Sequence, residues 1–298
     1  MNSVQTLYSE RFGLTGRPFC VLPDAELSHE GPSLIRAHAA LEYGLMTGAP
    51  FMALTGEAGT GKTSLLMRLM ADADETLRFA VVGGIRSGAG SILPWILQSL
   101  GEPITAEMTE PELHSRLQDL LIADYAAGRR VVLVIDEAQT LSTEALDELR
   151  LLTNINSAED QLVQVILSGH PGLRDMLRMP ALSGLVNRVG VWAALDPILR
   201  DETTGYIAAR LSAAGGPEDL FDEDAVAIVH AASAGLARAV NQLCEMALVF
   251  ALSGDGDRIT AQDVRAVLDH GMFVAPRPAH DPAPASNRPA RLRLASGE

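Results

Sequence analysis

The 298-residue sequence is 47% hydrophobic and 20% charged, which predicts a globular protein with an extensive core and excludes disorder for most of the chain. Its formal net charge of −15 argues against a general nucleic-acid-binding surface, because such a surface neutralises phosphates with clustered Lys and Arg. Cys20 and Cys244 lie far apart without metal-ligand spacing, which argues against a disulfide framework and a zinc site.

The N-terminus has no positively charged stretch followed by an apolar one, and no apolar run approaches the roughly 18 residues of a membrane-spanning helix. We therefore expect a cytoplasmic protein with no direct membrane span. Residues 1–50 are expected to form an N-terminal segment that packs on the domain after it, with a helix from about 33 to 46.

A glycine-rich segment follows the apolar run 51–54 and matches G-x-x-x-x-G-K-[ST] at every fixed position. Glycines let such a loop turn its backbone N–H groups toward phosphates, at the start of a helix. The lysine supplies positive charge to the β- and γ-phosphates, and the hydroxyl after it suits Mg²⁺. This segment predicts a phosphate-binding P-loop for ATP and Mg²⁺, formed by Gly56, Glu57, Ala58, Gly59, Thr60, Gly61, Lys62, Thr63 and Ser64.

Pro18 and Phe19, upstream of this loop, allow two interpretations. They could form an apolar wall for the adenine base, or Phe19 could be a core aromatic side chain in a turn.

Four more strands are predicted, at 78–82, 131–135, 162–167 and 189–195. Helices are expected between them at about 91–100, 110–127 and 142–156. Because 131–135 is a continuous β-branched run, it is typical of a strand buried on both faces of a parallel sheet. We therefore predict an α/β nucleotide-binding core over residues 51–196.

Asp136 and Glu137 directly follow the strand 131–135, at the end where ligands bind in open α/β sheets. Asp136 is suited to hold Mg²⁺, and Glu137 to orient and polarise the attacking water. The other interpretation is a pair of capping acids before the next helix. Ser168 and His170 end the neighbouring strand, where either could hydrogen-bond the water or the γ-phosphate, or only satisfy its own turn.

From residue 197 the pattern is helical, with segments at 201–214, 222–233, 237–252 and 260–270. Four helices after an α/β core predict a separate small lid domain over 197–271. Residues 272–298 are rich in Pro, Ala and Arg, which is typical of a disordered tail.

A set of short segments occurs in a fixed order along the chain: Phe12–Leu14, Pro18-Phe19, Pro23-Asp24, Tyr43–Leu45, Leu54–Glu57 running into the P-loop, Ile135–Gln139, Leu149–Asn154, Arg200–Thr203, Tyr206-Ile207, Gly235–Arg238 and Asn241–Cys244. In these segments the chain resembles the AAA+ ATPases of the ExeA/GspA type from general-secretion systems, over roughly residues 7–270. It is more distantly similar to transposition ATPases of the TniB and MuB type.

This resemblance implies a five-stranded parallel sheet in the order 5-1-4-3-2, followed by the helical lid. It implies that Arg238 of the lid reaches the phosphates, where the alternative is a surface charge. It also implies that Arg188 is a finger offered to a neighbouring subunit's γ-phosphate, where the alternative is a salt-bridged residue at a strand end. The chain departs from the family at His170, where Gln is usual, and at Trp192, where many members have a second arginine.

The leading hypothesis is an ATP hydrolase that assembles into a homo-oligomer in the ATP state and acts on an unidentified protein partner. The alternative is a transposition or replication accessory ATPase that binds DNA. The overall acidity disfavours DNA, although the tail arginines Arg277, Arg288, Arg291 and Arg293 leave a small basic excess. A small-molecule kinase is a third reading, which the Asp136–Glu137 pair and the helical lid disfavour.

Overall fold

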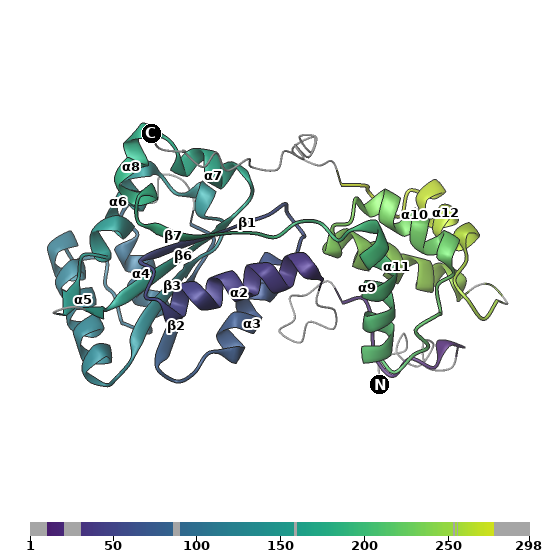
Figure 1. The fold of residues 1–298 in the computed structure, drawn as a ribbon, viewed down its shortest axis with the longest axis horizontal. Coiled ribbons are helices and arrows are strands. Elements are labelled where there is room, and N and C mark those ends of the chain that lie inside the picture. Colours follow the sequence, from purple (N-terminus) through teal and green to yellow (C-terminus); the bar gives the residue numbers. More distant parts are fainter. Residues whose placement is uncertain are drawn as a thin grey trace, which may run out of the picture.

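A computed structural model describes residues 11–20, 31–85, 90–157, 160–252, 254 and 256–276, and they form a sheet-containing body and a helical body (Figure 1). The sheet consists of five parallel strands in the order β2-β3-β6-β1-β7. Their bounds are β1 Phe51–Thr55, β2 Leu77–Val82, β3 Arg130–Ile135, β6 Val163–Gly169 and β7 Val189–Ala194. Numbered one to five along the chain, these strands give the predicted order 5-1-4-3-2, which is confirmed.

The central strands β1, β3 and β6 are buried on both faces of the sheet, which explains why β1 and β3 are almost continuously apolar. On one face, Met52 and Leu54 of β1 share a core with α2 (Pro32–Met46) and α3 (Lys62–Asp72). On the other face, Phe51 and Ala53 share a core with α4 (Leu93–Ser99), α5 (Glu110–Ala126) and α6 (Thr143–Leu152). Successive side chains of β1 therefore alternate between two cores, as the pleat of a strand requires.

Two short elements on each side of β6 were not predicted. The hairpin of β4 (Asn156–Ser157) and β5 (Asp160–Gln161) precedes it, and α7 (Gly172–Leu177) and α8 (Ser183–Val186) follow it. The helix predicted over 142–156 ends at Leu152, so that prediction is wrong by four residues. Thr153 caps the end of the helix, where its hydroxyl donates to the Arg150 carbonyl oxygen at 2.8 Å and accepts from Arg188 at the same distance.

The helical body contains all of the helices that were predicted after residue 197. They are α9 (Arg200–Ala213), α10 (Glu223–Ser233), α11 (Ala237–Ala251) and α12 (Ala261–Asp269). Their shared core includes Ile207, Val229, Leu243 and Val264. Phe273 is also buried in this core, so the lid extends past the predicted boundary at 271. The rest of the predicted tail, from residue 277, lies outside the described residues.

The N-terminal segment corrects a prediction. Of the described residues before β1, 11–20 pack on the lid and α2 packs on the sheet. Phe12, Leu14 and Phe19 are buried in the lid core, and Phe19 meets Phe221 edge to face at 5.8 Å. The backbone N–H of Thr15 also donates to the Ala214 carbonyl oxygen at 2.8 Å. A sequence pattern shows that aromatic side chains will be buried but not in which of two cores.

Within the described ranges, no helix combines the length and the apolarity needed to cross a lipid bilayer.

Candidate nucleotide-binding site

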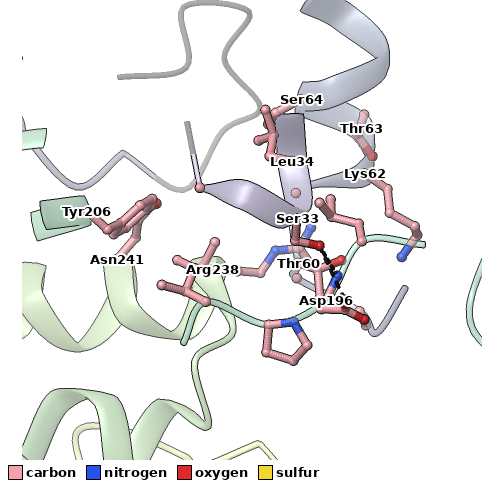
Figure 2. Close-up of a pocket in the computed structure, with 18 of the residues that line it drawn as sticks. Ser33, Leu34, Thr60, Lys62, Thr63, Ser64, Asp196, Tyr206, Arg238 and Asn241 are labelled. Atoms are coloured by element: carbon pink, nitrogen blue, oxygen red, sulfur yellow. Dashed lines mark hydrogen bonds between the residues drawn. The ribbon is translucent and has the colours of Figure 1, made fainter. Parts of the chain in front are cut away.

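A cavity lies where the P-loop faces the lid (Figure 2). Its lining comes from the loop and the start of α3, from the beginning of α2, from the connection between β7 and α9, and from α9 and α11. Lys62 and Thr63 lie on one side of the view, Tyr206 and Asn241 on the other, and Arg238 between them. We call the first side the phosphate end and the second the lid end.

The P-loop takes a left-handed backbone at two of its glycines. Gly59 has φ 89° and Gly61, which caps α3, has φ 106°, a region that side chains disfavour. Residues 58–64 all line the cavity. The loop therefore presents the N-terminus of α3 to the cavity, which favours an anionic ligand.

Lys62 is held inside this loop. Its Nζ donates to the carbonyl oxygens of Gly56 at 2.8 Å and Glu57 at 3.1 Å, and the residue is only 7% exposed. Burial lowers the pKa of the Lys62 amine, an effect that the nearby carboxylates of Glu137 and Asp136 oppose. The Lys62 amine therefore contacts the loop carbonyl oxygens and lies near the two acids that follow β3. We expect a bound phosphate to replace the carbonyl contacts.

Asp136 is the centre of a hydrogen-bonded group at the ends of two neighbouring strands. Its Oδ1 accepts from the Ser168 hydroxyl and from the backbone N–H of Glu137, both at 3.0 Å. Its Oδ2 lies 3.4 Å from the Thr63 hydroxyl, which donates to it. A hydroxyl and a carboxylate are the oxygen donors that Mg²⁺ prefers, and it usually takes its other ligands from phosphates and water. The side chains of Thr63 and Asp136 therefore fit a magnesium ion held together with a nucleotide.

Glu137 lines the same cavity from an exposed position after β3. Its backbone is left-handed with φ 54°, which is uncommon for a residue with a side chain and is found often at functional sites. One carboxylate oxygen accepts a hydrogen bond from the Gln139 side-chain amide. Glu137 therefore lies next to the predicted metal ligand Asp136. It contacts Asp136 through its backbone N–H, and its carboxylate faces Gln139.

The structure separates the two candidate polar residues after β6. Ser168 contacts Asp136, whereas the His170 ring accepts from the backbone N–H of Gly172 at 2.9 Å through Nδ1. The Nδ1 atom of His170 therefore accepts from the first backbone N–H of α7. For this nitrogen, the structure agrees with the interpretation of His170 as a residue that satisfies its own turn.

The two arginines proposed by resemblance lie in different places. The backbone N–H of Arg238 donates to the Gly59 carbonyl oxygen at 3.0 Å, and its side chain lines the cavity. Arg188 is outside the cavity lining and donates to the Thr153 hydroxyl at 2.8 Å and to the Asn154 side-chain oxygen at 2.6 Å. Both of these partners are neutral, and no salt bridge involves Arg188 in the described part of the chain.

The adenine-wall interpretation of Pro18 and Phe19 is wrong for these two side chains. Phe19 is fully buried in the lid core, and neither residue lines the cavity. The Pro18 carbonyl oxygen instead accepts from Arg210 Nε at 2.9 Å. The next residue, Cys20, reaches the cavity.

Sequence reasoning missed most of the lid end. The Tyr206 hydroxyl donates to the Asn241 side-chain oxygen at 2.9 Å, and the Asn241 amide donates to the Cys20 carbonyl oxygen at 3.3 Å. Burial raises the pKa of Tyr206 above its usual 10.0, so its hydroxyl stays protonated and available as a donor at neutral pH. Tyr206 and Asn241 both belong to segments that carry the family resemblance, which was the signal available for them.

The connection to the lid is also fixed at the cavity. Ser33, at the start of α2, accepts a hydrogen bond from the backbone N–H of Asp196 at 2.9 Å (Figure 2). The backbone N–H of Ile198 donates to the Gly235 carbonyl oxygen at 2.8 Å. Ser33, Asp196 and Ile198 all line the cavity, and no local motif pointed to them.

The chain is similar to known proteins both in sequence and in fold. A family model described as an AAA domain matches residues 45–177. The chain is 33% identical over 274 residues to general secretion pathway protein A of Aeromonas hydrophila, an alignment that covers 90% of this chain and 50% of that protein. The chain thus spans about half the length of this curated relative.

Solved structures agree on the fold. CDC6P from Pyrobaculum aerophilum matches with a TM-score of 0.66 and 19% identity, covering 85% of this chain and 70% of that chain. The ORC2 protein of Aeropyrum pernix in its ADPNP and ADP complexes matches with a TM-score of 0.64 and 17% identity, covering 85% of this chain and 71% of that chain. At these identities the likeness concerns the fold.

Proposed function

We propose that this chain, an AAA+ P-loop protein that resembles general secretion pathway protein A, binds ATP with Mg²⁺, hydrolyses it, and uses its nucleotide state to act on a protein partner. The observation that supports hydrolysis most directly is the group around Asp136. Ser168 and Thr63 contact its carboxylate while Lys62 and Glu137 line the same cavity. Binding and hydrolysis each have a group suited to them within one site.

Each residue has a distinct role in this proposal. Lys62 and the P-loop N–H groups bind the phosphates, and Arg238 approaches them from the lid. Thr63 and Asp136 would hold Mg²⁺, which neutralises phosphate charge when bound. Glu137 accepts a proton from the attacking water, and Ser168 keeps the Asp136 carboxylate oriented.

Two variants separate binding from hydrolysis. Lys62→Ala should weaken ATP binding, because it removes the buried positive charge. Glu137→Gln should bind ATP normally and lose turnover by about 10²-fold or more, the size of a general-base contribution. ATP affinity and the steady-state rate should be measured for both purified variants, with Gln118→Met on the exposed face of α5 as the control. Equal loss of binding in both variants would contradict these roles.

We further infer that the ATP-bound protein assembles and that Arg188 serves a neighbour's nucleotide. This proposal draws on its neutral partners, Thr153 and Asn154, which orient the guanidinium without neutralising it. An arginine acting in trans can contribute about 10³-fold to phosphoryl transfer. Specific activity should therefore rise with protein concentration, and Arg188→Ala should remove that rise, whereas Arg116→Ala on α5 should not. Normal hydrolysis by an assembled Arg188→Ala sample would place the finger elsewhere.

The partner can be sought with the Glu137→Gln variant, which should trap the ATP-bound form. Capture experiments with and without ATP should enrich a protein that recognises this state. DNA binding is the alternative, and the net charge of −15 disfavours it. ATP-dependent binding to duplex DNA that weakens steeply with salt would favour that alternative, because phosphate contacts release counterions. A cytoplasmic location stays a prediction.

A further inference from the structure

The side-chain amide of Gln139 links the segment that follows β3 with the segment that follows the neighbouring strand β6. Gln139 lies in a single 3-10 turn (Ala138–Thr140) that follows β3. Its Nε2 donates to a carboxylate oxygen of Glu137, and its Oε1 accepts from the backbone N–H of His170 at 3.2 Å. A carboxylate only accepts and a backbone N–H only donates, so these two partners fix which way the amide points.

The end of β6 leaves room for this amide. A Cβ atom added at Gly169 would overlap the Gln139 amide oxygen and would come within 3.0 Å of Leu173. Any side chain at position 169 would therefore push the amide away from the β6–α7 turn. The observed position of the Gln139 amide therefore requires glycine at position 169.

Among the described residues, Gln139 is the side chain that hydrogen-bonds the Glu137 carboxylate, which also lies near the charged Lys62 amine. Glu137 is exposed, its backbone N–H donates to Asp136 at 3.0 Å, and its side-chain carboxylate accepts a hydrogen bond from Gln139. A glutamate side chain loses conformational freedom when it is fixed, so an unrestrained Glu137 would spend much of its time away from the cavity. A general base must be held within reach of the water, and small displacements are costly to the rate.

We propose that Gln139 is a positioning residue that holds the Glu137 carboxylate at the nucleotide cavity while its own carbonyl group is anchored to the β6–α7 turn. This inference rests on the proposed ATPase function. Gln139 itself is not among the residues that line the cavity. It acts by restricting the base and by linking the base to the turn that begins α7.

Two substitutions separate the halves of this bridge. Gln139→Glu keeps an acceptor for the His170 N–H but loses the donor to Glu137 and places a second carboxylate beside it. Gln139→Met has a similar length and loses both bonds. We expect both variants to lower kcat by about 10-fold or more, as for a lost hydrogen bond to a charged group, while the ATP dissociation constant stays within about twofold. Gln118→Met on α5 should match the wild type.

The outcome for Gln139→Glu is the decisive one. A wild-type kcat for Gln139→Glu would overturn the proposal, because the bond to the His170 N–H would then suffice without a donor to Glu137. Thermal unfolding of each variant establishes that the protein is folded. A variant that loses ATP affinity and kcat together would also count against a positioning role, because binding would then be damaged.

A double-mutant cycle with Glu137→Gln completes the test. If Gln139 acts through Glu137, Gln139→Met should cause no further loss of turnover once Glu137 has been replaced. A further loss would show that Gln139 acts on another group and would overturn the proposal. If Glu137→Gln alone leaves turnover intact, the proposed ATPase mechanism fails. If Glu137→Gln abolishes turnover but the Gln139 variants keep the wild-type kcat, only the inference about Gln139 fails.

Discussion

At the phosphate end of the cavity, residues 58–64 come from one uninterrupted stretch, whereas the lid end is assembled from Cys20, Tyr206, Arg210 and Asn241. The P-loop can take its shape from its own glycines and from the helix that it begins. The lid end exists only after the N-terminal segment, α9 and α11 have packed together. The comparison shows that the P-loop depends mainly on local sequence, whereas the lid end of the same cavity depends on tertiary packing.

This comparison also assigns different consequences to damage at each end. The phosphate end carries the groups proposed for phosphate binding and for chemistry, so a change at Lys62 should appear in ATP affinity and a change at Glu137 in kcat. The lid end carries packing and hydrogen-bonding groups, so changes there should appear in affinity and in lid stability.

The largest effect that we expect at the lid end comes from Phe19→Ala. The ring is fully buried against Phe221 in the lid core, and truncating a buried Phe costs about 3–5 kcal/mol. Hydrogen exchange should show faster exchange in α11 and little change in β3, with weaker ATP binding as a consequence. Faster exchange in β3 with an unchanged α11 would mean that residues 11–20 support the sheet body instead, and would break the comparison.

A smaller effect is expected from Tyr206→Ala, which removes a ring that lines the cavity and a hydrogen bond to Asn241. The ATP dissociation constant should rise by about 10-fold, since an aromatic contact contributes roughly 1 kcal/mol beyond its buried area. Tyr206→Phe keeps the ring and should lose about threefold, near the net value of one hydrogen bond. Equilibrium binding and kcat should be measured together, because a loss confined to kcat would contradict the assignment of this end to affinity.

The smallest effect concerns pH. Burial, and secondarily Arg200, lowers the pKa of His230 in the lid below its usual 6.5, and the ring nitrogen Nδ1 lies 2.8 Å from the Thr203 hydroxyl. On acidification the unfolded chain therefore binds a proton before the folded lid does, so the stability present above about pH 6.5 is lost as pH falls through and below that value.

The lid of the wild-type protein should accordingly unfold at a lower temperature at pH 5.5 than at pH 7.5. His230→Asn should reduce this pH dependence. An equal pH dependence in the two proteins would assign the effect to other groups.

The fold was predictable where sequence pattern and structure depend on the same local physics. The five strands, the P-loop and the four lid helices follow from continuous apolar runs, from glycine spacing and from helical periodicity. The end of α6 at Leu152 was not predictable in this way, because no Gly or Pro marks it, and its C-cap Thr153 is contacted by Arg188 from a distant part of the sequence.

By itself, the sequence determined the phosphate end of this site. Lys62 and Thr63 are in the loop, and Asp136 and Glu137 end a strand, so the rule that ligands bind at the carboxyl ends of parallel strands brings them together. Tertiary structure alone decided that Ser168 and not His170 contacts Asp136, that Phe19 is buried in the lid, and that Tyr206 and Asn241 line the cavity. The physical reason is that these outcomes depend on which surfaces pack together after the elements form, and neither hydrophobic period nor spacing records that choice.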